Sequence, residues 1–459
     1  MELYSGNAET EELKMKKLRS VALITLALAV AIPNLWANGE SEAQDEGPRT
    51  LEVFVFAGPI KEAFWQEVIA EFNTKYPEVE VELTAIPKIN DQVRPRIAAS
   101  DPPDVYFVAG ANNIPVDQLV AEDLIVSLQP LLDAEVWEGG SNFADSLAPG
   151  NVKYFDGTPY SIVLPKHIVG FWYHEPTFQA KGWDVPKNFA DFQALCPEIE
   201  AAGMAPMVTT GIYPYYFKDF VLKSSVASAA GRQALLDWKN LKPGFFTSEA
   251  FRSVLERYQW VIENDYLLKG SEGMNHVASQ SEWVHGKAAF VPTGTWLEAE
   301  MKNDFPEGFA EGIRFTPSFF IGENDPQVVH PLGAASMTVF DTPEQDLSLE
   351  FLRTLYSKDV IKKMTEITNI LSIVPAANSV SQKSAAVSSA VDFYDSLEVV
   401  TWPVGGYGSQ DVDRELAAKL QGLMTGQITA EEICEALEAK AAEVRNDPDA
   451  IFFEAYFPE

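Results

Sequence analysis

The pattern of apolar and polar positions after residue 50 predicts strands and helices in alternation. Strands are indicated where apolar residues form short runs, and helices where they recur every three or four residues. In chain order the predicted strand, helix, strand, helix and strand cover residues 51–57, 61–77, 79–86, 91–99 and 104–110. Such a series is typical of parallel strands with right-handed crossovers, which places a ligand beyond the carboxyl ends of the strands.

That rule points to two loops as the rim of a pocket, residues 56–59 and 109–113. Each loop carries a glycine, Gly58 or Gly110, at which the backbone can approach a ligand closely. Taken singly, each glycine fits a plain tight turn better than a ligand contact.

The pattern changes after residue 150. Residues 155–175 hold two strand-like runs separated by residues 165–167, and helical spacing then dominates from 189 to 263. Strand character returns at 288–292 and at 330–340. The chain is therefore expected to cross between two lobes more than once, which predicts a hinge and a cleft that can enclose a ligand.

The length supports two lobes, because about 420 residues after a cleaved leader exceed what one hydrophobic core usually serves. We expect a signal region at 1–37 and a flexible linker at 38–49. An N-terminal α/β lobe should cover 50–160, with returning segments around 288–345. A helix-rich second lobe with the hinge crossings should cover mainly 161–287 and 346–459.

An aromatic residue stands at a predicted strand-to-helix turn in WVHGKAAFVPTGTWLEAEM, residues 283–301. The pattern predicts a strand at 287–292, a turn at 293–295 and a helix at 296–302. Trp296 would then lie beside the free backbone N–H groups of the helix start. A flat ring beside hydrogen-bond donors suits a neutral sugar, although the same tryptophan fits a buried core position equally well.

Composition narrows the range of partners. The chain has a formal net charge of −33 and 46% hydrophobic residues, so it can form a core but would repel nucleic acid and anionic lipid. The five histidines lack metal-ligand spacing, and we expect neither a metal nor a cofactor. Cys196 and Cys434 could pair in an oxidising compartment or remain single buried thiols.

The first residues have the three parts of a secretory signal. Four basic residues from Lys14 to Arg19 precede an apolar run at 21–33, and Ala37 supplies a small residue at the cut. We expect the signal peptide to begin at Met15. No later segment reaches the ~20 apolar residues needed to span a bilayer, and no cysteine stands directly after the expected cut to carry a lipid anchor. We expect a periplasmic or extracellular protein without membrane insertion.

Six segments together have a recognisable pattern: EFNTKYPEVEVEL, PPDVYF, FDGTPYSIVLP, GWDVPKNFADFQALC, HGKAAFVPTGTW and FLRTLYSKDVIKKM. They resemble the extracellular solute-binding proteins of ABC importers, family 1, in the carbohydrate-binding group. Three further segments, KINDQVRPRI, GIYPYYF and GSEGMNHVASQSEW, are most similar to binding proteins for N-acetylglucosamine and diacetylchitobiose. The chain departs from its relatives at Lys166 and His167, where these often carry an aromatic or small residue.

The resemblance implies a two-lobe α/β fold of the periplasmic-binding-protein kind, type II-like, with a hinge and an interlobe ligand cleft. It implies the substrate-binding component of an ABC sugar importer, which captures a small saccharide by lobe closure and delivers it to a membrane permease. The work of such a protein is binding, so no catalysis is expected. We also expect a monomer, because the cleft works within one chain.

Ten residues are candidates for contact with the ligand. Trp296 is the first, since it stands at the family's G-x-W position. Among three tyrosines between Gly211 and Phe217, at least one ring should face the cleft while another lies in the core. The polar candidates each have another explanation within the fold. Asn112 and Asn113 can hydrogen-bond their own backbone, His167 can hydrogen-bond a neighbouring protein group, and Glu298 can cap a helix. The remaining candidates are Tyr213, Tyr215, Tyr216, Gly58, Asn112, Asn113, His167, Glu298 and Trp402.

Two alternatives stay open. An exported glycoside hydrolase would need two carboxylates roughly 5 to 10 Å apart, which the many acidic residues allow. Only Glu298 stands beside the aromatic candidates, however, and no G-x-S-x-G, H-E-x-x-H or P-loop motif occurs. The same fold could instead carry a peptide or a polyamine, and a polyamine would require aromatic walls with several carboxylates.

Overall fold

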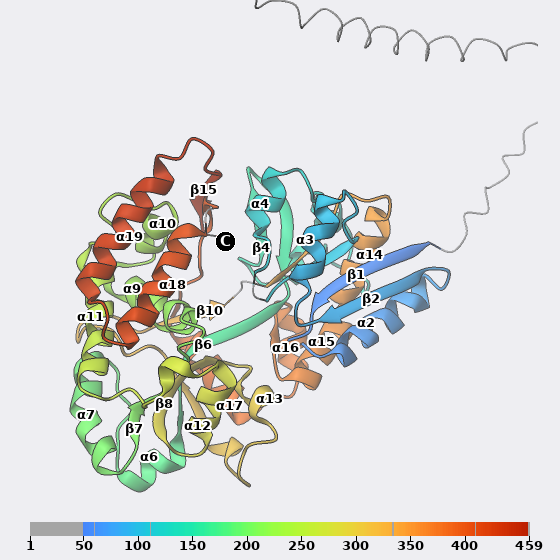
Figure 1. Cartoon of the computed structure of the whole chain (residues 1–459). Helices are drawn as coiled ribbons and strands as arrows, with labels where there is room; N and C mark the ends of the chain where they lie inside the picture. The colour runs from blue at the N-terminus through green and yellow to red at the C-terminus, as the bar shows by residue number, and fades with distance from the viewer. Residues whose placement is uncertain (1–48, 59, 111, 333–334, 409, 458–459) are drawn as a thin grey trace, which may run out of the picture. The chain divides into compact units, whose positions relative to one another are not determined.

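The computed structural model (Figure 1) describes residues 49–58, 60–110, 112–332, 335–408 and 410–457. The expected signal region, and all of the expected linker except Arg49, lie outside the described residues. The chain from residue 48 onward forms one compact unit, and that unit contains two large sheets, each with its own helices.

The first lobe is built on a six-stranded sheet with the order β2-β1-β3-β11-β5-β4. Strands β1, β2 and β3 run parallel and are connected by α2 and α3, which confirms the predicted alternation. Strand β11 joins β3 to β5 by antiparallel pairing. The elements of this lobe are β1 Thr50–Phe56, α2 Glu62–Lys75, β2 Glu80–Ile86, α3 Asn90–Ala98, β3 Val105–Val108, α4 Val116–Ala121, α5 Gln129–Asp133, η1 Ala144–Ser146, β4 Val152–Phe155, β5 Thr158–Val163, β11 Ser336–Val339, α14 Gln345–Leu355, α15 Lys358–Thr368 and α16 Pro375–Val380.

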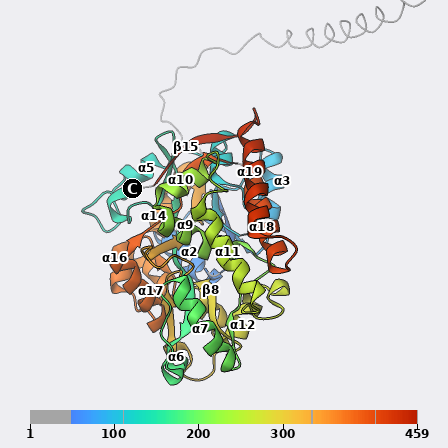
Figure 2. The same ribbon diagram turned by 90° about the vertical axis from the view of Figure 1, so that its left-hand side faces the viewer.

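The second lobe is built on a sheet with the order β13-β10-β6-β8-β7, in which β9 and β12 also pair with β6. Helices α9, α10, α11, α18 and α19 share one face of this lobe (Figure 2). Its elements are β6 Pro165–His174, α6 Glu175–Lys181, α7 Phe189–Ala201, β7 Ala205–Met207, α8 Tyr215–Phe217, η2 Lys218–Leu222, α9 Lys223–Ala230, α10 Gln233–Lys239, α11 Glu249–Glu263, η3 Ser271–Gly273, α12 His276–Val284, β8 Ala288–Gly294, α13 Leu297–Met301, η4 Ala310–Gly312, β9 Ile313–Thr316, β10 Val328–Leu332, β12 Leu371–Ser372, α17 Ala385–Ser396, β13 Glu398–Val399, α18 Asp411–Met424 and α19 Ala430–Arg445.

The chain passes between the two sheets repeatedly, as the sequence pattern predicted. It leaves the first sheet between β5 and β6 and returns between β10 and β11. It then pairs with β6 at β12, between α15 and α16, and passes to the second lobe between α16 and α17. A two-stranded sheet of β14 (Val404–Tyr407) and β15 (Phe452–Tyr456) then brings the chain's last described segment against β4. There the Tyr456 hydroxyl donates to the Tyr154 carbonyl at 2.9 Å and accepts from its N–H at 2.6 Å.

Three expectations about the crossings are corrected. Residues 288–294 form β8 between β6 and β7, so they belong to the second lobe and the return to the first begins only at β11. Helices α14 to α16 bury apolar residues in the core of the first lobe, although 346–459 was assigned mainly to the second. Residues 165–167 begin β6 instead of separating two strands, because a proline is tolerated at the first position of a strand.

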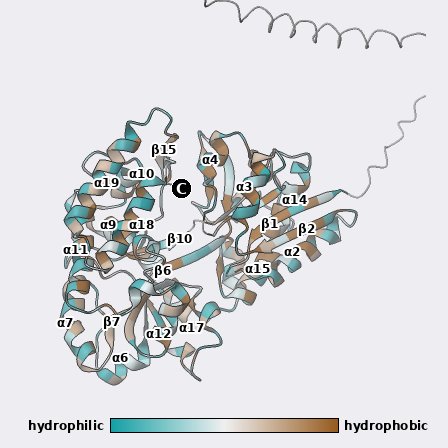
Figure 3. Cartoon of the chain, in the orientation of Figure 1, coloured by the Kyte–Doolittle hydropathy of each residue, from teal (hydrophilic) through white to brown (hydrophobic). Residues whose placement is uncertain are grey.

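Apolar residues at helical spacing explain how the first lobe assembles from distant segments. Phe72 and three other apolar residues of α2 are buried, and hydrophilic and hydrophobic positions alternate along this helix in Figure 3. Phe351 of α14 is fully buried and meets the Phe72 ring at 5.5 Å in an edge-on arrangement. The packing of α14 and α15 on α2 therefore ties residues near 350 to the first helix of the lobe.

Phe351→Ala should lower the free energy of unfolding by about 3–5 kcal/mol, because it removes a buried ring and leaves a cavity in this core. Ile367→Ala on α15 is the matched control, since Ile367 is 43% exposed and should change stability by less than about 0.5 kcal/mol. Urea unfolding followed by fluorescence measures both. Equal midpoints for the two variants would contradict this account of the core.

Candidate ligand-binding pocket

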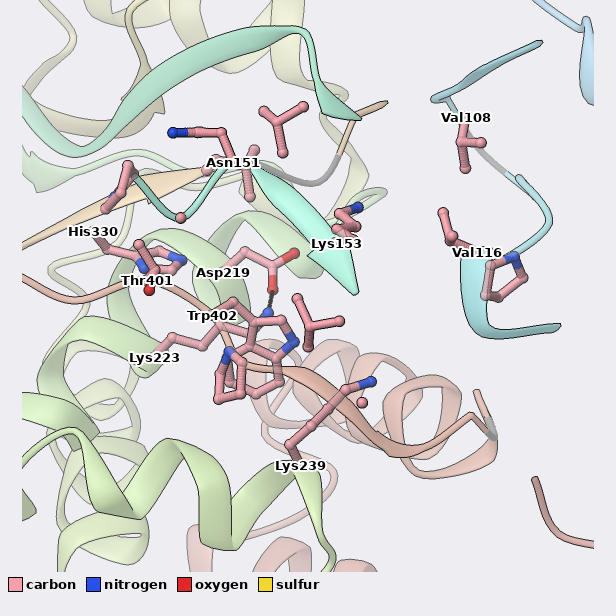
Figure 4. Close-up of a pocket in the computed structure, with 18 of the residues that line it drawn as sticks. Val108, Val116, Asn151, Lys153, Asp219, Lys223, Lys239, His330, Thr401 and Trp402 are labelled. Carbon is pink, nitrogen blue, oxygen red and sulfur yellow. Dashed lines mark ion pairs between the residues drawn. The ribbon is translucent and has the colours of Figure 1, made fainter. Parts of the chain in front are cut away.

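A pocket of about 400 Å³ lies where the two lobes meet. The first lobe contributes the end of β3, the start of α4 and β4, and the second contributes η2, α9, α10, α18 and the loop that leads into β14. Residues of the crossing segments, among them Pro165, Lys166, Pro331 and Leu332, complete the lining. A ligand bound there would contact both lobes and the connections between them (Figure 4).

Of the two loops predicted to form the pocket rim, residues 109–113 reach the pocket through Asn113. Val108 at the end of β3 and Asn113 in the following loop both line the pocket, as expected for the carboxyl end of a parallel strand. The Nδ2 of Asn113 donates to the Gly110 carbonyl at 2.9 Å. Asn112 is exposed with φ of 58°, and its carbonyl accepts from Arg94 at 3.0 Å.

Gly58 does not line the pocket, and its lack of a side chain has a packing reason. A Cβ atom at this position would lie 2.2 Å from the Phe56 ring. The ring also lies against Gly110, where a Cβ atom would come within 2.8 Å of it. These two glycines therefore make room for Phe56 between the predicted rim loops.

A network of ion pairs forms the second-lobe wall of the pocket. Lys223 Nζ lies 2.7 Å from Asp219 Oδ1, and Lys218 Nζ lies 3.5 Å from Asp219 and 3.2 Å from Asp413. Burial would raise the pKa of Asp219, but the two ammonium groups outweigh it and lower that pKa. Lys218 and Lys223 also lower the pKa of Asp413, whose side chain is 49% exposed.

The backbone of η2 explains how this network forms. Residues Lys218–Leu222 adopt a π-helix, a turn with i→i+5 hydrogen bonds that is frequent at functional sites. The wider turn brings Lys218 and Lys223, five residues apart, to the same carboxylate. Regular α-helical spacing would favour the Asp219–Lys223 pair alone.

Trp402 is the predicted aromatic residue that lines the pocket. Its indole is partly buried, with the Lys223 ammonium 3.6 Å from the ring centroid and Trp238 in edge-on contact at 5.3 Å. The cation and the ring attract each other. Lys223 therefore holds the indole in place at the pocket wall.

His330 of β10 also lines the pocket and is buried. Its Nδ1 lies 2.7 Å from the Val400 carbonyl, which can only accept, so Nδ1 carries the proton and Nε2 has the free lone pair. Burial and the nearby Lys223 charge lower the pKa of His330 to about 4. Within the described residues Nε2 has no hydrogen-bond partner.

Trp296 lies in an aromatic cluster beside the pocket. The ring is only 6% exposed and packs with Tyr216, Phe220 and Val169. Leu332 contacts this cluster and also lines the pocket, so the two features adjoin. The predicted order of strand, turn and helix is present, with β8 ending at Gly294 and Trp296 as the residue before α13.

The tyrosines divide between surface and core. Tyr215 is 43% exposed, Tyr213 is half-buried and Tyr216 is 5% exposed. His167 meets the Trp296 ring edge-on at 4.8 Å, and burial lowers its pKa to about 3. A ligand role for this cluster remains a prediction, and it would require movement of the rings that cover Trp296.

Glu298 is hydrogen-bonded to side chains in the segment between α15 and α17. Its Oε2 accepts from Asn369 Nδ2 at 2.7 Å and from the Ser384 hydroxyl. Burial raises the pKa of this carboxyl despite both hydrogen bonds. Glu298 thus connects α13 to the start of α17, and it does not line the pocket.

The cysteines, the potential metal ligands and the length of the helices also bear on what kind of site this protein has. Cys196 and Cys434 are both buried and unpaired. Among the residues that the structure describes, no group of three side chains is placed to hold a metal ion. None of the described helices is both long and apolar enough to cross a membrane.

The family model for bacterial extracellular solute-binding proteins matches residues 57–362, and the chain belongs to this family. It is 22% identical over 428 residues to the diacetylchitobiose binding protein NgcE of Streptomyces coelicolor, covering 89% of this chain and 85% of that protein. It is 27% identical over 371 residues to the alpha-glucosides-binding periplasmic protein AglE of Rhizobium meliloti, covering 71% and 73%.

Solved structures share the two-lobe fold. A chitin oligosaccharide binding protein superposes with a TM-score of 0.69 at 18% identity, covering 85% of this chain and 98% of that one. The solute-binding protein RafE in complex with raffinose gives a TM-score of 0.63 at 14% identity, covering 85% and 98%. The expected α/β fold with two lobes is thereby confirmed.

The buried neutral His330 should make stability fall with acidification. An unfolded histidine titrates near pH 6.5 and the folded one near 4, so in this window the unfolded chain binds the extra proton. From pH 7 to pH 5 this one group should cost about 2 kcal/mol. His330→Gln should remove that part of the pH dependence in urea unfolding, while the exposed control His285→Gln should not. An unchanged pH dependence in His330→Gln would contradict the assignment.

Proposed function

We propose that this protein is the substrate-binding component of an ABC sugar importer, which captures a small saccharide by lobe closure and delivers it to a membrane permease. The observation that carries the proposal is the pocket at the lobe crossing, lined from both lobes, in a member of the solute-binding family. A ligand that contacts both lobes favours the closed form, and a permease can recognise that form.

The pocket suits a small saccharide in size and chemistry. Its volume of about 400 Å³ falls within the ~300–1,000 Å³ typical of small-ligand sites. The partly exposed Trp402 ring can contact C–H groups on the side not covered by Lys223, and Asn151, Thr401 and His330 offer polar partners for hydroxyls. Because neutral His330 has its lone pair at Nε2, it can accept a hydrogen bond from a hydroxyl but cannot donate one there.

Relatives suggest an N-acetylated cargo. NgcE is named for diacetylchitobiose, and a structural neighbour is a chitin oligosaccharide binding protein. N-acetylglucosamine or its disaccharide is therefore the first ligand to test. Micromolar affinity, about 8 kcal/mol, would require only one stacked ring and several hydroxyl contacts.

The lining of the pocket argues against a hydrolase that uses Asp219 or Asp413, and against a polyamine as cargo. A glycoside hydrolase needs a protonated carboxyl beside a second carboxylate, but the lysines keep Asp219 and Asp413 ionised by lowering the pKa of each. A polyamine would meet five lysines in the lining, and their charges would repel it.

Diacetylchitobiose should raise the melting temperature of the protein, because a ligand that binds only the folded state stabilises it by about 2.7 kcal/mol at 100 times its Kd. A thermal-shift screen over mono- and disaccharides would identify the best ligand. If no saccharide at all shifts the transition, the proposed function is wrong.

Trp402→Ala should weaken binding of that best ligand by roughly tenfold, equal to about 1.4 kcal/mol of lost ring contact. Trp137→Ala is the control, because Trp137 belongs to the first lobe and does not line the pocket. Isothermal titration calorimetry measures both affinities. Equal losses in the two variants would remove Trp402 from the site.

Prolonged incubation with diacetylchitobiose separates binding from catalysis. We expect the disaccharide to remain intact by chromatography, since the lowered pKa values of Asp219 and Asp413 disfavour either carboxyl as the proton donor. Steady release of monosaccharide by the purified protein, and its loss in Asp219→Asn, would establish the hydrolase instead.

A further inference from the structure

The charge of the pocket lining is opposite to the charge of the chain. The whole sequence has 34 basic and 67 acidic side chains, yet five lysines and three aspartates line the pocket: Lys153, Lys166, Lys218, Lys223, Lys239, Asp117, Asp219 and Asp413. The lysines come from β4, the start of β6, η2, α9 and α10. A cationic lining in an acidic protein calls for an explanation in terms of the ligand.

The aspartates balance only part of this positive charge. Asp219 and Asp413 pair with Lys218 and Lys223 in the network at η2. Within the described part of the chain, Lys166 and Lys239 form no ion pair, and Lys166 Nζ lies 3.7 Å from the centroid of the Tyr394 ring. The lining therefore carries more lysines than aspartates, although Asp395 and Asp413 act on Lys166 and Lys239 from beyond ion-pair distance.

Two lysines of the lining, Lys153 and Lys239, come from different lobes. Lys153 lies on β4 of the first lobe and donates to the Ser336 hydroxyl at 3.2 Å, while Lys239 ends α10 of the second lobe. Burial lowers the pKa of Lys153 to about 8, Asp117 partly opposes this, and the charge of Lys239 lowers it further. The two ammonium groups thus repel each other across the pocket (Figure 4).

This repulsion connects ligand charge to lobe closure. Any movement that narrows the pocket brings the two ammonium groups closer and raises their mutual repulsion. An anion between them converts the repulsion into two attractions and restores favourable surroundings to partly desolvated lysines. A neutral sugar leaves the repulsion in place.

We propose that the pocket selects a saccharide bearing a carboxylate, such as a uronic acid unit, and that Lys153 and Lys239 hold this carboxylate from opposite lobes. The inference rests on the proposed function and narrows its substrate class. A disaccharide of glucuronic acid and N-acetylglucosamine would combine the carboxylate with the N-acetyl group that the relatives suggest.

The test compares one sugar skeleton with and without its charge. The probes are glucuronyl-N-acetylglucosamine, the methyl ester of the same disaccharide, and diacetylchitobiose, each titrated into the full chain by calorimetry at pH 7. The acid should bind at least about tenfold more tightly than its ester, as expected for a charge-assisted contact. This preference should shrink as salt concentration rises.

Lys239→Met should reduce the preference for the acid over the ester to within about twofold, because it removes one of the two cations. Lys153→Met tests the cation from the other lobe in the same way. The matched control is Lys242→Met, since Lys242 follows α10, is 60% exposed, pairs with Asp237 and does not line the pocket. The control should keep the full preference, and circular dichroism verifies that each variant is folded.

The outcomes separate this inference from the proposed function. If acid and ester bind equally while neutral sugars bind tightly, the carboxylate proposal is wrong and the sugar-binding function stands. Binding of a sugar phosphate such as glucose 6-phosphate without binding of the uronate would also overturn it. A preference that survives in both lysine variants would show that the carboxylate lies elsewhere. If no saccharide binds, both proposals fall together.

Discussion

The passage of β6 from one lobe to the other is the constraint on which the remaining structure depends. Its first residues pair with β12 and β10 at the crossing, while its later residues form the centre of the second sheet. The same crossing segments contribute Pro165, Lys166 and Leu332 to the pocket. Because the connections between the lobes are also part of the binding surface, ligand contacts and lobe movement are mechanically linked.

A second contact between the lobes comes from the end of the described chain. Phe453 of β15 meets Phe155 at 5.1 Å, and the Tyr456 hydroxyl bonds both backbone groups of Tyr154 on β4. The two-stranded sheet of β14 and β15 also contacts α10 in the second lobe. The pocket is therefore bounded by the crossing strands and by this small sheet, so an opening of the lobes would strain or release the contacts of the sheet.

The sequence predicted elements better than it predicted where they pack. The series from β1 to β3 matches to within a few residues, because local apolar spacing determines it. Periodicity could not show that β8 joins the second sheet or that Phe351 packs on α2, since both depend on contacts with distant segments. Local signals did identify two residues that line the pocket: Trp402, as an aromatic residue, and Asn113, from its place in a loop after a strand. The lysines were missed because they converge from positions between 153 and 239.

The local charge of the pocket has to act against the field of an acidic chain. A net charge of −33 repels anions at long range, but salt screens exposed charges beyond a Debye length of about 8 Å under physiological conditions. Within the pocket, partial burial weakens this screening, and the charges that line it are those of five lysines and three aspartates. Long-range charge therefore acts on the rate of encounter, whereas under the carboxylate proposal the lining lysines act on the bound ligand. The two signs of charge do not cancel each other, because they act over different distances.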